Sequence, residues 1–165
     1  MKHTLERIYR EHRQGLYTLA LSITRCTGRA EDAVHDAFAR LWRRGTLPGG
    51  DLLPYVFAAV RNAAIDQLRR APPAAGREAA SIFVAPPADP ADAALDAELQ
   101  RQVRQSLESL PPDQREAVVL KVYGGLTFDQ IARTLGEPLP TVASRYRRAL
   151  EALAGKIRRV MGAVR

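Results

Sequence analysis

Apolar residues recur every three or four positions along most of the chain, which is the pattern of helices that bury one face. Three such stripes in the first half predict three or four packed helices, with Gly28 as a break and residues 45–53 as a loop. No stretch alternates apolar and polar residues as a strand does, so the predicted fold class is all-α. The apolar positions are Leu16, Leu19, Ala20 and Ile23, then Val34, Ala37, Phe38 and Leu41, then Val56, Ala59, Val60 and Ala63.

The second half repeats the helical pattern. Leu95, Leu99, Val103 and Leu107 have the spacing of one helix face. A second helix is expected to begin at Pro111-Pro112-Asp113, because proline suits a first helical turn, and to end at Gly124-Gly125. Between the halves, residues 71–91 contain five prolines and no helical period. We therefore predict a helical domain over 1–71, a Pro/Ala-rich linker over 72–91 and a second helical domain over 92–165. The linker's one apolar island, Ser81 to Val84, has no assigned role.

Residues 127–153 have the pattern of a helix-turn-helix. Thr127 and Gln130 form a capping box, so the first helix is expected to start at Thr127. Gly136 ends it, and Pro140 suits the first turn of the next helix.

The second helix of this pair has two different faces. Val142, Tyr146, Ala149, Leu150 and Leu153 fall on its apolar side. Its polar side carries Thr141, Ser144, Arg145 and Arg148. Short polar and arginine side chains on one helix face suit the major groove of DNA. The alternative is an ordinary helical hairpin with solvated arginines.

The charge of the chain is compatible with a nucleic-acid partner. Its 165 residues include 25 Lys+Arg and 18 Asp+Glu, with a net charge of +7. The two ends are basic and the middle is not, which favours polyanions. The single cysteine, Cys26, excludes an internal disulfide and is expected to be buried or half-buried. No apolar segment is long enough to span a membrane and the N-terminus lacks a signal core, so we expect a cytoplasmic protein.

We find no residues arranged for catalysis. The chain has no Gly-x-x-x-x-Gly-Lys loop and no Gly-x-Ser-x-Gly elbow. Asp32 and His35 have the spacing of metal ligands on a helix, but no second pair completes a site. We therefore predict no enzymatic activity, no metal and no cofactor.

Two further helix faces are candidate binding surfaces. In residues 30–44 the polar face suits a protein partner, although it would also suit solvent, with pairs such as Asp36 with Arg40. This face carries Asp32, His35, Asp36, Arg40 and Arg43, next to the only tryptophan, Trp42. In residues 54–70 an amide and several guanidinium groups suit nucleic acid. The alternative is a face exposed to solvent, with an ion pair between Asp66 and Arg70. This second face carries Arg61, Asn62, Asp66, Arg69 and Arg70.

Five sequence blocks, taken in order, resemble bacterial sigma-70-family factors of the extracytoplasmic-function group. The resemblance covers about residues 4–71 and 92–160. The blocks are Ala30-Glu-Asp-Ala-Val-His-Asp-Ala-Phe-Ala-Arg-Leu-Trp42, Arg61-Asn-Ala-Ala-Ile-Asp-Gln-Leu-Arg-Arg70, Leu110-Pro-Pro-Asp-Gln-Arg-Glu-Ala-Val-Val-Leu120, Gly125-Leu-Thr-Phe-Asp-Gln-Ile-Ala132 and Thr141-Val-Ala-Ser-Arg-Tyr-Arg-Arg-Ala149.

The resemblance implies a promoter-specific initiation factor without enzymatic activity or cofactor. Its partners would be core RNA polymerase (the β′ clamp and the β subunit), promoter DNA and an anti-sigma factor, with the linker threading through the polymerase. Core binding would fall to Asp32, His35, Asp36, Arg40 and Trp42. The −10 element would be read and opened by loop 45–53 with Arg61, Asn62, Asp66, Arg69 and Arg70. The −35 element would be read by Thr141, Ser144, Arg145 and Arg148.

Two other protein classes share some of these features. A stand-alone helix-turn-helix regulator would bind operators by itself, but the blocks at 31–42 and 61–70 would have no role in such a protein. In a helical protein-interaction module, the basic faces would only be exposed to solvent. Polymerase binding and promoter-specific transcription separate the three.

Overall fold

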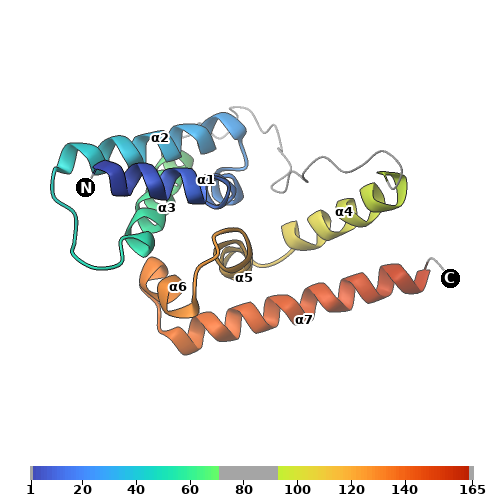
Figure 1. Cartoon of the computed structure of the whole chain (residues 1–165). Helices are drawn as coiled ribbons and strands as arrows, with labels where there is room; N and C mark the ends of the chain where they lie inside the picture. Colours follow the sequence, from blue (N-terminus) through green and yellow to red (C-terminus); the bar gives the residue numbers. More distant parts are fainter. Residues whose placement is uncertain (1, 71–92, 164–165) are drawn as a thin grey trace.

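The computed structural model describes residues 2–70 and 93–163, and its regular structure is entirely helical within those ranges (Figure 1). The predicted linker, with its apolar island, lies outside them. The described elements are α1 (Lys2–Thr24), α2 (Thr27–Arg44), α3 (Leu53–Arg70), α4 (Ala93–Glu108), α5 (Pro112–Val118), the π-helical turn η1 (Val119–Tyr123), α6 (Phe128–Leu135) and α7 (Leu139–Ala163).

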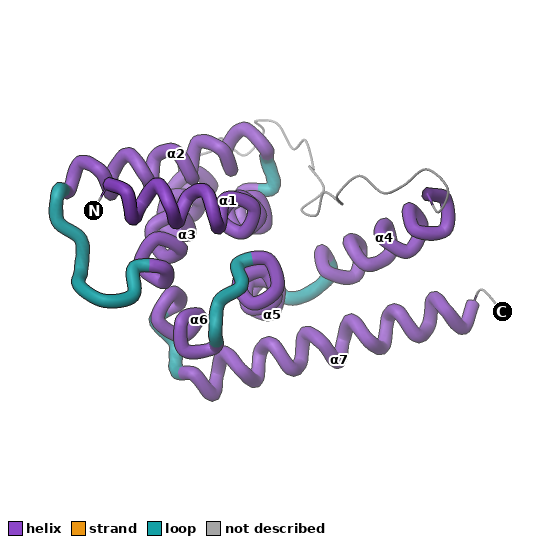
Figure 2. Tube along the Cα trace, viewed as in Figure 1, coloured by secondary structure: helices purple, strands orange, loops and turns teal. Residues whose placement is uncertain are grey.

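The first three helices pack against one another, as their apolar stripes predict, and form one group in Figure 2. Leu16, Leu19 and Phe57 are among the side chains with no exposed surface. The expected break at Gly28 is wrong, because Gly28 lies inside the first turn of α2. The chain turns instead at Arg25, whose φ of 56° is left-handed, and the Thr24 hydroxyl closes the turn by donating to the Cys26 carbonyl.

The remaining helices form a second group around α5 and α7. Arg115 in α5 donates to the backbone carbonyls of Leu107, Glu108 and Leu110 at the end of α4. The Glu108 carbonyl is one of the acceptors that the last turn of α4 leaves open. Burial lowers the pKa of this guanidinium, which stays charged. As expected, a helix begins at Pro112 and the helical backbone ends before Gly124.

The helix-turn-helix is confirmed in its local detail. The Thr127 hydroxyl accepts from the backbone N–H of Gln130, whose side chain accepts from the backbone N–H of Thr127. Gly136 adopts φ 66° after α6, where only glycine fits without strain, and Pro140 lies in the first turn of α7. One predicted core position is wrong, because Leu150 is 43% exposed. It lies at the edge of the apolar stripe, in which Val142 and Ala149 are completely buried.

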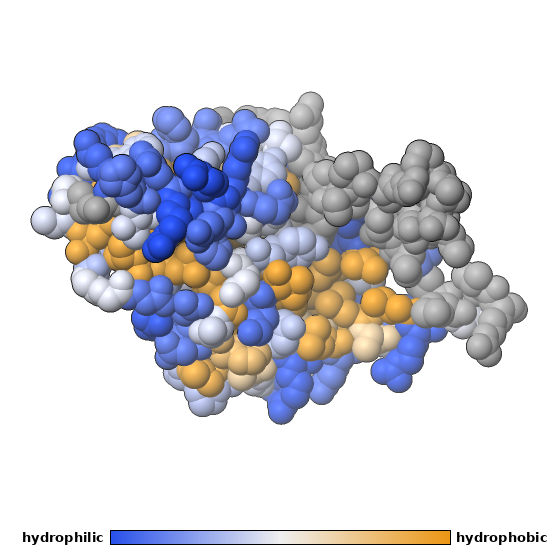
Figure 3. All heavy atoms as spheres, in the orientation of Figure 1, coloured by the Kyte–Doolittle hydropathy of each residue, from blue (hydrophilic) through white to orange (hydrophobic). Residues whose placement is uncertain are grey.

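The two helical groups are in contact, α1 with η1 and α3 with α6 (Figure 1). Gly15 of α1 comes so close to η1 that a Cβ there would stand 2.6 Å from the Tyr123 carbonyl oxygen. Apolar side chains show around α5 and between α4 and α7, whereas charged side chains cover α1 (Figure 3). This contact brings α3, with its predicted −10 residues, next to the helix-turn-helix.

Candidate nucleic-acid and protein interfaces

The outward face of α7 carries side chains suited to DNA. Arg148 is exposed and Ser144 is partly exposed, while Val142 and Ala149 are buried on the opposite side. Arg145 lies differently, beside the core and 24% exposed. It forms ion pairs with Asp113 and Glu137, both at 3.3 Å. Of the predicted −35 residues, Arg148 is thus the exposed cation, whereas Arg145 is held by two carboxylates.

Sequence reasoning missed Arg147. Its side chain is exposed on α7, three residues after Ser144 and next to Arg148. Because residues three apart share a helix face, Arg147 extends the polar surface that faces away from the core. The helical period could have indicated this position. The apolar stripe of α7 is centred on Val142, Tyr146 and Ala149, and Ser144 and Arg147 lie on the opposite side of the helix.

The predicted −10 residues of α3 do not share one environment. Asn62, Arg69 and Arg70 are exposed. Arg61 is turned toward the second helical group, where its Nε donates to Glu116 of α5 at 2.5 Å. Their side chains are only 29% and 15% exposed. The predicted −10 surface therefore meets the second helical group at this ion pair.

The expected pairs Asp36 with Arg40 and Asp66 with Arg70 are not the ones that form. Arg40 instead lies 3.5 Å from Asp66, and the Gln67 amide donates to Asp36 at 3.3 Å. Both contacts join α2 to α3. The side chains of α2 thus pair with the neighbouring helix and not with the next turn of their own helix. Predicted polymerase-binding residues thereby touch predicted −10 residues.

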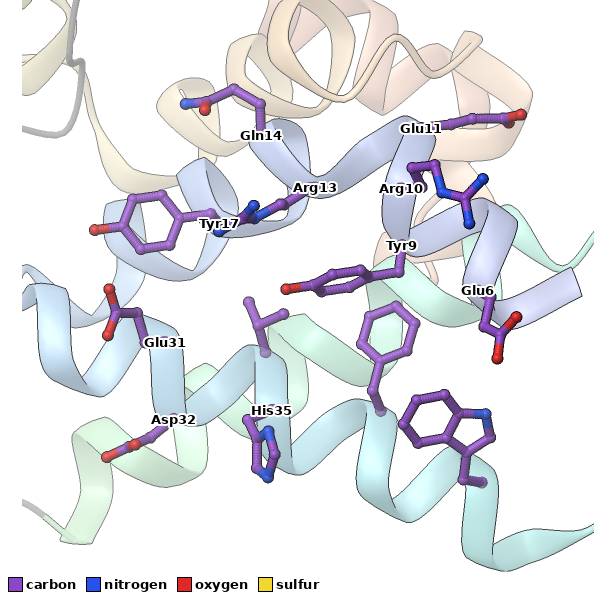
Figure 4. A pocket seen from close by; sticks show the side chains of 13 residues that line it. Glu6, Tyr9, Arg10, Glu11, Arg13, Gln14, Tyr17, Glu31, Asp32 and His35 are labelled. Atoms are coloured by element: carbon purple, nitrogen blue, oxygen red, sulfur yellow. The ribbon is translucent and has the colours of Figure 1, made fainter. Parts of the chain in front are cut away.

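A groove runs between α1 and α2 on the side away from α3 (Figure 4). Asp32 and His35 of α2 line it together with Tyr9, Arg10 and Arg13 of α1. The groove also includes Glu6, Glu11, Gln14, Tyr17, Glu31, Val34, Phe38 and Trp42.

The aromatic side chains of this groove form a short edge-to-face series. Phe38 contacts Tyr9 with ring centres 5.1 Å apart and Trp42 with ring centres 6.5 Å apart. Phe38 is buried, whereas Trp42 is 46% exposed. An exposed tryptophan beside mixed charges is typical of a surface that receives another protein.

Loop 45–53 is fixed at its end by Asp51. One carboxylate oxygen accepts from the Leu53 N–H at the start of α3, at 3.1 Å. The other accepts from Gln130 at 2.8 Å and from Arg133 at 3.2 Å, both on α6. The Gln130 amide is the main cause of an Asp51 pKa below its usual value, with further contributions from the Leu53 N–H and Arg133.

Cys26 is half-buried, as expected. Over the described ranges, no three His, Cys, Asp or Glu side chains cluster as metal ligands do. Within those same ranges, no helix has the length and apolar character to cross a bilayer.

The comparisons with known proteins identify the family. The profile of Sigma-70 region 2 matches residues 8–72, and that of Sigma-70 region 4 matches residues 100–153. The ECF RNA polymerase sigma factor SigK of Mycolicibacterium vanbaalenii is 34% identical over 152 residues, which cover 88% of this chain and 77% of that protein. The chain belongs to the ECF group of RNA polymerase sigma factors. Its all-α fold, with two helical groups and a helix-turn-helix in the second, is confirmed.

Other relatives agree with this assignment. SigK of Mycobacterium tuberculosis H37Rv is 29% identical over 153 residues, covering 88% of the sigma factor described here and 81% of that protein. Among solved structures, the sigma factor RpoE of Bartonella quintana, crystallised with the anti-sigma factor NepR, has a TM-score of 0.67 and 25% identity. That match covers 95% of this chain and 96% of RpoE. CnrH, solved with the cytosolic domain of CnrY, shares the fold at a TM-score of 0.65 and 22% identity, over 94% and 88% of the two chains.

The environment of Asp51 yields a prediction about pH. Because its pKa is lowered by groups of α6, the contact contributes stability above the ordinary aspartate pKa of about 3.9, and that contribution is lost as pH falls through the lowered pKa. Gln130→Ala should move the Asp51 pKa toward its ordinary value, measured by carbon-detected NMR titration. Thr127→Ala is the control, since it weakens the same cap and leaves the Gln130 amide in place. An Asp51 pKa that is unchanged in Gln130→Ala would contradict this assignment.

Proposed function

We propose that this sigma factor directs promoter-specific initiation through three separate surfaces of one chain. The observation that carries the proposal is the presence of region 2 and region 4 together, each with a polar, arginine-bearing helix face. We assign residues 1–71 to one domain and 92–165 to the other, with residues 72–91 connecting them. As a non-catalytic factor that works with polymerase, it would act in the cytoplasm.

Core polymerase would bind the groove between α1 and α2. The surface combines acidic, basic and aromatic side chains, and an exposed Trp42 would be covered on binding. We assign the contact to Asp32, His35, Asp36, Arg40 and Trp42, against the β′ clamp, with the β subunit as a further partner of the holoenzyme.

The −10 element would be read and opened by loop 45–53 and the exposed part of α3. Unpairing a base costs a few kcal/mol, so this surface must offer groups that hold unpaired bases. Amide and guanidinium side chains can bind phosphates and base edges, which suits Asn62, Arg69 and Arg70. Arg61 and Asp66 complete the assigned set.

The −35 element would be read as duplex DNA by α7. We assign Thr141, Ser144, Arg145 and Arg148 to this role and add the exposed Arg147. The fold supports it, because the capped α6 and the glycine turn at Gly136 set α7 as the recognition helix of a helix-turn-helix.

We further propose an anti-sigma partner. RpoE, which has the same fold, is known in complex with the anti-sigma factor NepR, and CnrH is known in complex with the cytosolic domain of CnrY. A stand-alone regulator is not favoured, because it gives no role to the region 2 match over residues 8–72.

The function itself is tested by run-off transcription. The chain mixed with core polymerase should give promoter-dependent transcripts from some members of a promoter library, whereas core polymerase alone should give none. A complete lack of promoter-dependent transcript across the library would overturn the proposed function.

The docking surface predicts a selective loss of polymerase affinity. Reversing the charge of Asp32 and Asp36 should weaken core binding in a titration, because both side chains would then repel basic side chains of the polymerase. Stability should change by no more than about 0.5 kcal/mol at the exposed Asp32, whereas reversal of the half-buried Asp36 also removes its hydrogen bond from Gln67 and should cost more. The matched control is Glu151→Lys on exposed α7, which should leave core affinity intact. Unchanged affinity in the double variant would show that this face is only solvated.

The two nucleic-acid surfaces should fail in different ways. Arg148→Ala should weaken −35 duplex binding by roughly 1–3 kcal/mol if it reads a base, or equally for all sequences if it contacts phosphate. Asn62→Ala should instead impair opening, and a template pre-melted at −10 should rescue it in part. Permanganate footprinting separates the two, with Arg158→Ala, exposed farther along α7, as the control. Equal opening defects without rescue would refute this division of roles.

A further inference from the structure

One of the arginines assigned to the −35 element is held by acidic side chains of two other elements. We propose that Asp113 and Glu137 are positioning residues of the recognition helix. They hold Arg145, and through it they fix the orientation at which the other polar side chains of α7 meet the bases. Arg145 thus contributes to −35 specificity without contacting a base. This inference rests on the proposed function and divides the assigned −35 residues by role.

The ion pairs of Arg145 join three elements of the second helical group. Its Nε lies 3.3 Å from Asp113, in the first turn of α5. A terminal nitrogen donates to Glu137, in the turn between α6 and α7, also at 3.3 Å. The two carboxylates therefore bind different nitrogens of one planar guanidinium. Because α5 and α6 both pack against α7, the arginine links the recognition helix to both neighbours (Figure 1).

Both carboxylates stand on a fixed backbone. Glu137 follows Gly136, whose left-handed φ of 66° ends α6, and its N–H donates to a carbonyl of α6 at 3.1 Å. Such a bond closes the C-terminus of a helix. Asp113 uses its other oxygen to accept from the Gln114 N–H at 2.9 Å. The two acids can therefore determine where the Arg145 guanidinium lies.

Arg145 lies at the border between the apolar and polar sides of α7. Since residues three and four apart are neighbours on a helix surface, Thr141 and Arg148 lie directly beside it. The Arg145 side chain is only 24% exposed, whereas Arg148 is exposed. Arg145 directs its guanidinium toward α5 and the turn after α6, and Arg148 stays available to DNA. A fixed Arg145 thus supports the residues that face the groove.

These pairs adjust the recognition helix and do not hold the domain together. The Asp113 and Glu137 side chains are 52% and 37% exposed, so each ion pair by itself is weak. Val142 and Ala149 are completely buried and keep α7 packed on its neighbours without the acids. Loss of the acids should therefore change the orientation of α7 and leave the fold intact.

The test is a variant that removes the two acids and keeps every side chain assigned to DNA. It is Asp113→Asn with Glu137→Gln, which preserves the size of both side chains. The matched control is Glu98→Gln with Glu151→Gln, which removes the same charge from exposed positions that do not contact Arg145. Far-UV circular dichroism verifies the helical content of each variant.

The readout is the sequence preference of the holoenzyme formed from the full chain and core polymerase. It is a ratio of two affinities, one for a promoter that the wild-type holoenzyme transcribes and one for the same promoter with scrambled −35 base pairs. General attraction to phosphates cancels in this ratio, and a mere loss of stability does not change it. The double-acid variant should lower the ratio by on the order of tenfold, about as much as losing one good base contact. The control should keep the wild-type ratio.

Arg145→Ala completes a double-mutant cycle. Because Arg145 acts through the two acids, its removal should lower the ratio in the wild-type background and have little further effect where both acids are already replaced. An equal loss in both backgrounds would overturn the proposal, since Arg145 would then read DNA itself. If the double-acid variant loses helical content, the single Glu137→Gln, which leaves α5 unchanged, replaces it in the cycle.

The outcomes separate this inference from the proposed function. A wild-type ratio in the double-acid variant, with promoter-dependent transcription intact, would overturn the positioning role alone, because release of Arg145 would then leave the preference unchanged. A wild-type holoenzyme that transcribes no promoter of the library would overturn the proposed function, and this inference with it.

Discussion

The arrangement of the whole sigma factor depends on one close approach of two backbones, that of Gly15 in α1 to Tyr123 and Gly124 beside η1. No other residue type fits at Gly15 without displacing backbone atoms. Gly124 is confined in turn, because a Cβ there would lie 2.6 Å from the Leu120 oxygen and 3.2 Å from the ring of Phe57. Two glycines that face each other across the junction let α3 and α6 come within hydrogen-bonding distance.

This approach explains why charged residues at the junction are paired across it. Arg61 and Glu116 pair across the junction and are partly buried, where an unpaired charge would be costly. Asp51 meets α6 at the more exposed edge. The pairs alone would be too weak to hold two domains, and the apolar contact alone would not fix their register. Together they account for one defined arrangement of the two halves.

Much of the fold could be predicted from local signals. The capping box at Thr127, the left-handed Gly136 and the start of α5 at Pro112 depend on neighbouring residues, so a single sequence contains them. The turn between α1 and α2 was misplaced at Gly28, because nothing local marks Arg25 as the residue that adopts positive φ. The exposure of Leu150 was missed because it lies at the edge of the apolar stripe, where the geometry of neighbouring helices decides burial.

The candidate surfaces were less predictable, since tertiary contacts select among possible partners. Helical spacing favours Asp36 with Arg40, whereas the structure joins Arg40 to Asp66 across two helices. Likewise nothing near Arg61 in the sequence indicates Glu116, which is 55 residues away. The family resemblance identified regions 2 and 4 but contained no information on how the two halves meet.

The central claim is that the two halves of the free sigma factor are joined through the close approach at Gly15. The most direct measurement is the efficiency of energy transfer between two dyes attached to cysteines. One dye is on Thr46→Cys in loop 45–53 and the other on Glu151→Cys of α7, and both positions are exposed. The native cysteine is removed by Cys26→Ser. The predicted result is high transfer in the wild-type chain that falls in Gly15→Ala, because the added Cβ would displace the backbone at Tyr123. Equal transfer in the wild-type chain and in Gly15→Ala would contradict the account.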